Sequence, residues 1–251
     1  MLNIDEFLST VNSSKEQEGT DFSAHKLAGV SLKAINFSYA NFEKTDLAQS
    51  QLIGINFSNA KLKSASLNKA KIKETDFSGA NLQEVDLQEA VLINCNFRNA
   101  SLENCNLASA VLKNCDLKGA NLDYVNLYSA EISGCNLSFA RMMYGYLKQI
   151  AIVSSQMNGI NARGSDFSFA KIKDADLRGA ILKYADLNSC TLEKVNLSNA
   201  NLIGAELKDS HCRNLVIEHA NLEGADLTGA DLQGARLEGV DLRNSRGFAL
   251  D

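Results

Sequence analysis

The chain repeats a hydrophobic residue at every fifth position without interruption. From Phe22 to Leu242, forty-five positions spaced by five residues are Leu, Ile or Phe, with only four exceptions. These exceptions are Met142, Met157, Ala162 and Cys212. No residue is inserted or deleted within the series, so its register never shifts. Repetition of this kind decides the fold class before any local secondary structure is considered.

A period of five residues fits neither a regular helix nor a flat strand. In an α-helix, five residues advance about 140° beyond a full turn, so the hydrophobic residues would spiral around the helix. In a flat strand, an odd period places successive members on opposite faces. The chain must therefore bend once in every repeat, so that each central residue points toward a shared axis.

A small residue and a polar residue precede each central hydrophobic residue. The position two residues earlier is usually alanine, as at Ala60, Ala70, Ala80, Ala90, Ala100, Ala110, Ala120, Ala130 and Ala140. The intervening position is often Asp or Asn, as at Asp76, Asn81, Asp86, Asn96, Asp116, Asn121 and Asn126. The consensus is therefore Ala, then Asp or Asn, then Leu, then two variable residues.

This consensus resembles the repeat of the pentapeptide repeat family. Residues 80–84 read Ala-Asn-Leu-Gln-Glu, residues 225–229 read Ala-Asp-Leu-Thr-Gly, and about nine tenths of the chain follows the pattern. The resemblance implies an all-β fold, a right-handed quadrilateral parallel β-helix (a solenoid) with four repeats in each coil. Forty-five repeats would then make about eleven coils. At strand spacing, the rod would be on the order of 50 Å long.

The N-terminal end of such a stack needs a cap, because an open end exposes the core and unpaired strand edges. Residues 1–19 are expected to supply it. Asn3 and Glu6 have the spacing of a capping box, and apolar residues follow at helical spacing. We expect a short capping helix over residues 3–12, followed by a linker over residues 13–19.

Residues 20–244 are expected to form the β-helix, and residues 245–251 a short C-terminal tail. In this tail, Phe248 and Leu250 could cover the last coil. The tail is too short to form the C-terminal dimerisation helix of some DNA-mimicking members of the family. We therefore expect a monomer.

No catalytic or metal-binding arrangement is evident in the sequence. The three histidines are His25, His211 and His219, and none has a second histidine or a carboxylate at a spacing typical of metal sites or catalytic triads. Cys95, Cys115 and Cys135 are twenty residues apart and would form one inward column. A metal or redox ladder is one interpretation, but cysteine also matches alanine in size and burial. We expect core packing, no cofactor and no enzymatic activity.

Bulk properties exclude several classes of partner. The net charge of -5 argues against a protein that binds nucleic acid through a general basic field. No apolar run reaches 18 residues, and the chain begins with acidic rather than basic residues, so no membrane span or signal peptide is predicted. Six cysteines without signs of secretion suggest reduced thiols. We therefore expect a cytoplasmic protein.

The outward residues include an unusual group of aromatic side chains. Tyr124, Tyr144 and Tyr184 share an outward position at coil spacing, and exposed aromatic clusters are typical of interfaces. The predicted partner-binding surface, here named the tyrosine patch, consists of Tyr124, Tyr128, Met143, Tyr144, Tyr146 and Tyr184. Alternatively, residues 141–165 form a distorted coil, and these aromatic side chains fold back to fill it.

A second set of outward residues forms a mildly acidic face. The set consists of Asp46, Asp86, Glu89, Asp166, Asp186, Glu206 and Asp226. The face also carries lysines, so it could equally be the mixed-charge surface of a soluble protein.

Three functions are compatible with such a rod. The first is an adaptor or regulator that binds a protein, resembling the cyanobacterial pentapeptide proteins that modulate differentiation regulators. The second is a DNA mimic that binds the type II topoisomerase gyrase, resembling the quinolone-resistance proteins. The third is a structural spacer. The nearly neutral surface and the lack of inserted loops favour the first function, with a protein partner that the repeats do not identify.

Overall fold

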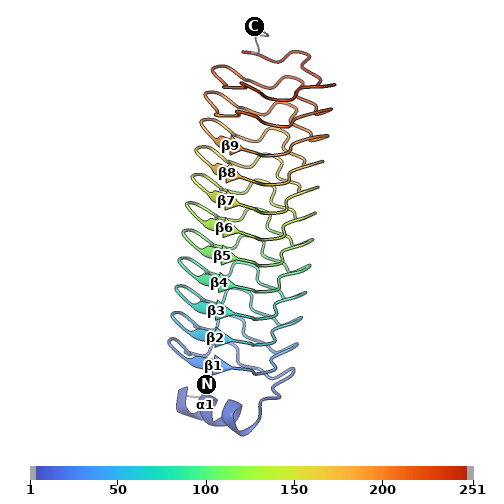
Figure 1. Cartoon of the computed structure of the whole chain (residues 1–251). Coiled ribbons are helices and arrows are strands. Elements are labelled where there is room, and N and C mark those ends of the chain that lie inside the picture. The colour runs from blue at the N-terminus through green and yellow to red at the C-terminus, as the bar shows by residue number, and fades with distance from the viewer. Residues whose placement is uncertain (1–3, 248–251) are drawn as a thin grey trace.

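The repeats wind into a single parallel β-solenoid with one helix at its N-terminal end (Figure 1). The computed structural model describes residues 4–247. Strand pairing joins residues twenty positions apart, as in Ser31 with Gln51 and Leu32 with Leu52. Twenty residues are four repeats, so each coil has four sides. The fold class expected from the repeat is confirmed.

One of the four sides is regular enough to form strands. Nine three-residue strands stack in chain order into one parallel sheet, visible as a column of arrows along the rod in Figure 1. They are β1 (Ser31–Lys33), β2 (Gln51–Ile53), β3 (Lys71–Lys73), β4 (Val91–Ile93), β5 (Val111–Lys113), β6 (Glu131–Ser133), β7 (Ala151–Val153), β8 (Lys171–Lys173) and β9 (Thr191–Glu193). The other sides pair through isolated bridges at the same twenty-residue spacing.

The expected number of about eleven coils is slightly too high. If each turn is counted from one strand to the next, the nine stacked strands correspond to about eight turns of the solenoid. Beyond β9 the twenty-residue spacing continues as far as the pair of Asp226 and Arg246, but only as isolated bridges. These repeats lengthen the rod without adding strands to the sheet.

Every backbone N–H group of a typical repeat has an acceptor, and this explains the preference for Asp or Asn. In residues 80–84, Ala80 donates to the carbonyl three residues earlier, and Asn81 donates to the preceding coil. Leu82 and Glu84 donate to the following coil. The remaining N–H group, from Gln83, donates to the side-chain oxygen of Asn81 at 3.1 Å. Without that oxygen, the N–H group of Gln83 would have no acceptor within the protein.

The strand side is the side that lacks this side-chain acceptor. The first residue of β1–β9 is never Asn or Asp. Two coils beyond β9, Asp231 occupies the same column and accepts the N–H of Gln233 at 3.1 Å. The corner hydrogen bond from Ala235 to the carbonyl of Leu232, at 2.9 Å, is also present there. The absence of Asn and Asp at this position therefore coincides with the side that stays extended as strands.

The last residue of each repeat forms a corner and has a positive φ angle. The angle is 59° at Tyr124, 56° at Tyr144 and 58° at Tyr184. This left-handed conformation costs a non-glycine residue roughly 1 kcal/mol. The corner residues other than glycine therefore adopt a backbone conformation that costs them free energy.

The core contains a column of stacked phenylalanine rings. Phe37, Phe57, Phe77 and Phe97 follow one another at centroid distances of 5.4, 5.3 and 4.9 Å. All four side chains are buried. The column predicted from the twenty-residue spacing is therefore present, and aromatic stacking adds to its hydrophobic burial.

The helix α1 (Ile4–Ser13) covers the N-terminal end of the core. Its buried Phe7 meets Phe22 edge to face at 5.2 Å. The expected capping helix is thus present, although Asn3 of the predicted capping box lies outside the described residues. No helix within residues 4–247 has the length and hydropathy needed to cross a bilayer.

The first coil begins inside the segment that was expected to be a linker. Glu16 pairs with Asn36, and the N–H of Gln17 donates to the carbonyl of Asn36 at 2.8 Å. Gln17 occupies a central position, and its side-chain amide donates to the carbonyl of Ser14 at 3.0 Å. Because the central residue of this repeat is polar, the hydrophobic pattern does not reveal it in the sequence.

The C-terminal coil is less completely covered than the rest. Leu232, Leu237 and Leu242 are only partly buried, whereas the earlier central residues are buried. Phe248 and Leu250, which were expected to cover this end, lie outside the described residues. Their role as a cap therefore stays a prediction.

Candidate interaction surface

The stretch 141–165 is a regular part of the solenoid. Arg141 pairs with Asn161, and Tyr146 pairs with Asp166, at the usual twenty-residue spacing. Met142, Met157 and Ala162, at its central positions, are buried. The aromatic side chains therefore do not fold back to fill a distorted coil.

Most exposed large apolar side chains gather in one section of the rod. Among residues 4–247, nine of the eleven such side chains lie between residues 124 and 184. They are Tyr124, Tyr128, Phe139, Tyr144, Tyr146, Val153, Phe169, Ile181 and Tyr184. The other two are Ile4 and Tyr39. These residues share one length of the rod but lie on several of its sides, with Val153 on the strand side in β7. Contiguous exposed apolar patches usually mark interaction sites, so the residues that contact one another are the candidates.

The structure brings most of the tyrosine patch together in two stacked pairs. Tyr124 and Tyr144 stack at 5.6 Å with an interplanar angle of 16°. Tyr128 and Tyr146 stack at 5.7 Å and 9°. Tyr184 lies in the same corner column as the first pair, two coils beyond Tyr144, and Met143 precedes Tyr144 in the chain.

Contacts on both faces hold the corner rings with their edges toward solvent. One face of Tyr144 lies against Tyr124, and the other lies over Gly164, where a Cβ atom would come within 2.8 Å of the ring. Tyr184 is held between the Arg163 guanidinium, 5.6 Å from its centroid, and Gly204. These rings remain about half exposed and are fixed in orientation before any partner arrives.

Sequence reasoning missed Phe139 and Phe169, which occupy corners near the patch. Lys118 lies 5.9 Å from the ring centroid of Phe139, and Lys148 lies 5.2 Å from that of Phe169. Gly159 follows Phe139 by twenty residues, just as Gly164 follows Tyr144, and its missing side chain leaves room for the ring. An aromatic corner residue followed one coil later by glycine is therefore a signal that could have identified Phe139.

The carboxylate of Asp123 holds the backbone of the patch at Met143 in place. It accepts a hydrogen bond from Arg141 at 2.5 Å and one from the backbone N–H of Met143 at 2.9 Å. In a typical repeat, Asn or Asp at the position of Arg141 would accept that N–H. The buried Asp123 of the preceding coil replaces this acceptor.

Replacing Asp123 with Ala should lower the free energy of unfolding by about 1 to 3 kcal/mol, because it leaves the Met143 N–H without its acceptor. Urea denaturation followed by circular dichroism would measure the loss. Asp123→Asn retains an acceptor oxygen and should cost less. Equal costs for both variants would contradict this role of the carboxylate.

The acidic face and the tyrosine patch share one side of the rod. Tyr146 pairs with Asp166, and the column continues through Asp186, Glu206 and Asp226, one residue in each coil. Burial raises the pKa of the Asp186 carboxyl, and the neighbouring charges of Asp166 and Glu206 raise it further. Four of the seven residues of the predicted acidic face therefore adjoin the patch.

The rest of the predicted acidic face lies nearer the N-terminus. Asp46, Asp86 and Glu89 come from earlier coils, three or more steps before Tyr146 in the twenty-residue register. The Glu89 carboxylate lies 3.7 Å from the ammonium group of Lys69. These residues do not form one site with the patch.

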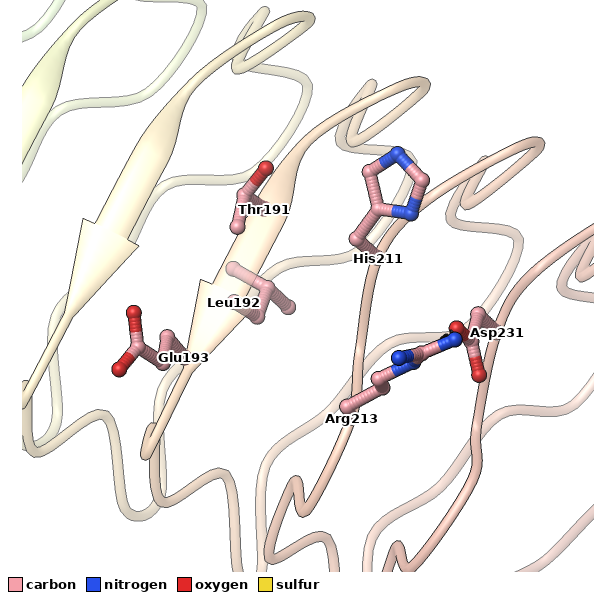
Figure 2. A pocket seen from close by; sticks show the side chains of 6 residues that line it. All are labelled: Thr191, Leu192, Glu193, His211, Arg213 and Asp231. Carbon is pink, nitrogen blue, oxygen red and sulfur yellow. Dashed lines mark hydrogen bonds and ion pairs between the residues drawn. The ribbon is translucent and has the colours of Figure 1, made fainter.

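A shallow depression of about 440 Å³ lies where the sheet ends (Figure 2). Thr191, Leu192, Glu193, His211, Arg213 and Asp231 line it. In Figure 2, the Arg213 guanidinium lies against the Asp231 carboxylate, and this hydrogen bond lowers the pKa of Asp231. These two opposite charges satisfy each other, so we assign no chemistry to this depression.

The six cysteines are buried and unpaired. In the predicted column, the backbone N–H of Cys115 donates to the sulfur of Cys135 at 3.3 Å. Burial raises the pKa of the Cys105 thiol to about 12, so this group is neutral at physiological pH. Within residues 4–247, no group of three or more His, Cys, Asp or Glu side chains is arranged to hold a metal ion.

Comparisons with solved structures find similar solenoids. HetL, a pentapeptide repeat protein involved in heterocyst differentiation regulation in the cyanobacterium Nostoc, is 27% identical, with 98% of this chain and 97% of that chain covered and a TM-score of 0.35. QnrB1, a plasmid-mediated fluoroquinolone resistance protein, is 18% identical, with 85% and 91% covered and a TM-score of 0.36. A pentapeptide repeat protein from the Arabidopsis thaliana thylakoid lumen is 27% identical, with 46% and 71% covered and a TM-score of 0.29.

The sequence also matches a family model. No curated protein is significantly similar to the chain. The model for pentapeptide repeats matches residues 18–50, 40–79, 80–119, 100–138, 154–183, 180–211 and 205–244. Because these matches span most of the solenoid, the chain belongs to the pentapeptide repeat family.

Proposed function

We propose that this protein is a non-enzymatic scaffold that binds another protein through the tyrosine patch. The observation that carries the proposal is the concentration of exposed aromatic residues between residues 124 and 184. Aromatic side chains supply a large contact area at interfaces, and rings that are already fixed lose little conformational entropy on binding. The rod serves as a rigid support for this surface.

The proposal extends to the setting in which the protein acts. We infer a monomer in the cytoplasm that needs no cofactor and whose partner is a protein. The charge of the chain, which is negative overall, disfavours direct binding of nucleic acid.

Gyrase is the main alternative partner, and the acidic column is the feature that favours it. A DNA mimic requires a strongly negative surface. Here Lys208 lies 3.5 Å from Asp226 and 3.8 Å from Glu206, which offsets part of the negative charge. Inhibition of gyrase supercoiling by low micromolar protein would favour this alternative over the tyrosine patch. A purely structural spacer would need neither surface.

Site-specific photo-crosslinking tests the proposed function. A photoreactive phenylalanine analogue at Tyr144 or at Tyr184 should cross-link a discrete partner in extracts of the native host. The same analogue at Lys44, an exposed residue in the same corner column, should not. Excess unlabelled wild-type protein should compete, whereas a folded Tyr144→Ser/Tyr184→Ser double variant should compete at least tenfold less well. Identical products from position 44 would refute the patch.

A further inference from the structure

The side that joins the tyrosine patch to the acidic column offers a continuous track along the rod. Its residues follow one per coil in the order Tyr146, Asp166, Asp186, Glu206 and Asp226. At about 4.8 Å per coil, the track is about 19 Å long. An extended peptide segment of about six residues has this length.

The C-terminal part of the track is hollowed. The corners beside Glu206 and Asp226 are Gly204 and Gly224, which have no side chains to rise above the surface. A depression of about 460 Å³ opens there, and Lys208 and Arg246 also line it. Side chains of a partner could therefore reach both carboxylates from the corner side.

The charge of the track selects the charge of its occupant. Four carboxylates lie along it, and three cations adjoin it: Lys148, which lies over the ring of Phe169, Lys208, and Arg246, which pairs with Asp226 one coil further on. Burial and the charges of Asp166 and Glu206 raise the pKa of Asp186, so the column is under mutual repulsion. A cation placed here relieves that repulsion, whereas an anion would increase it.

The tyrosines at the start of the track favour a protein segment over a bare polycation. Tyr128 and Tyr146 form a stacked pair beside the first carboxylate, and both side chains are exposed. Exposed aromatic edges pack well against apolar or aromatic side chains. The occupant should therefore combine an apolar or aromatic end with a basic end.

We propose that this track binds an extended segment of the partner protein, with its apolar or aromatic residues on Tyr128 and Tyr146 and its Lys or Arg residues on Asp166, Asp186, Glu206 and Asp226. The inference rests on the proposed function and names the chemical class of its partner.

A synthetic peptide tests the charge requirement. The probe is a fluorescein-labelled peptide that begins with two tyrosines and continues with about six alternating arginine and alanine residues. Its fluorescence anisotropy should show saturable binding to the full-length protein, and the affinity should fall as salt increases. The matched peptide with glutamate in place of arginine should not bind.

Variants of the track locate the binding. Asp186→Asn/Glu206→Gln preserves hydrogen-bonding shape and should weaken binding about fivefold, because it removes the charge from two exposed ion pairs with the peptide. Glu74→Gln/Asp174→Asn removes the same charge from corners on the strand side and should change the affinity less than twofold. Lys208→Gln removes a competing cation and should strengthen binding. Tyr146→Ser should weaken binding without reducing its dependence on salt.

Three results would overturn the inference: equal binding of the glutamate peptide, equal loss in the Glu74 and Asp174 control, or no loss in the Asp186 and Glu206 variant. If position 144 cross-links a partner while the arginine peptide fails to bind, the track is wrong and the proposed function remains. If the peptide binds the track while positions 144 and 184 cross-link nothing, the proposed role of the corner tyrosines is wrong.

Discussion

Replacing Phe77 with Ala is expected to lower the free energy of unfolding by about 3 to 5 kcal/mol. The ring of Phe77 stacks between those of Phe57 and Phe97, at 5.3 and 4.9 Å. Hydrogen bonds between successive coils hold the backbone spacing on both sides, so the cavity left by the ring cannot collapse easily. Urea denaturation monitored by circular dichroism measures the effect.

Phe77→Leu is the matched control for this substitution. Leu117 and Leu137 occupy the same column in later coils and are buried there, so leucine is compatible with the position. We expect this variant to cost about 1 kcal/mol. If the alanine variant were no less stable than the leucine variant, the phenylalanine column would not stabilise the N-terminal half of the rod.

Deleting residue Asn104 alone should destabilise the protein more than deleting the whole coil of residues 101–120. The single deletion shifts every later residue out of the five-residue register, so at least one corner must lose its hydrogen bonds. The backbone of residues 103–105 makes four such bonds. At about 1 kcal/mol each, they amount to about 4 kcal/mol. The coil deletion joins Ala100 to Asn121 and keeps each column in phase. The protein therefore loses only the stability that one coil contributes.

Circular dichroism, size-exclusion chromatography and urea denaturation of the two deletion variants check this expectation. The variant lacking residues 101–120 should retain its β-sheet spectrum and a cooperative transition. Deletion of residues 101–105 is an informative intermediate, because it preserves the inward positions but rotates the columns by one side. A variant without Asn104 that is as stable as the wild type would show that the register is not a constraint.

The inward half of the structure could be predicted from the sequence because a single rule governs it. Each central residue from Phe22 to Leu227 is buried, including the exceptions Met142 and Cys212. The column of Phe37 and its successors also follows from the twenty-residue coil. Burial of apolar side chains dominates the energetics of a solenoid, and the sequence records it directly.

The features that escaped prediction depend on polar and conformational details. Gln17 begins the first coil, but a polar residue at a central position does not look like part of a hydrophobic repeat. The strand side could have been found, because Asn and Asp are missing from the first positions of β1–β9. That signal becomes interpretable only when the role of Asn81 as a backbone acceptor is known.

The candidate site could be predicted in its composition but not in its shape. The exposure of Tyr124, Tyr144 and Tyr184 follows from their corner positions. Their orientation does not, because it depends on contacts with neighbouring coils such as those with Gly164 and Arg163. Phe139 and Phe169 also occupy corners, but neither has a second aromatic residue one coil away in its column, so the sequence shows no cluster there.

Because the corner residues lie outside the core, the binding surface of the rod can evolve without a change in its fold. A bulky residue such as Tyr144 gains nothing from the local backbone there, and its φ of 56° would suit glycine better. Its side chain points away from the core, so a new corner residue can create or erase a contact with a partner while the packing beneath stays the same. A rod of this kind can therefore acquire new binding specificities one corner at a time, each at a small and local cost in stability.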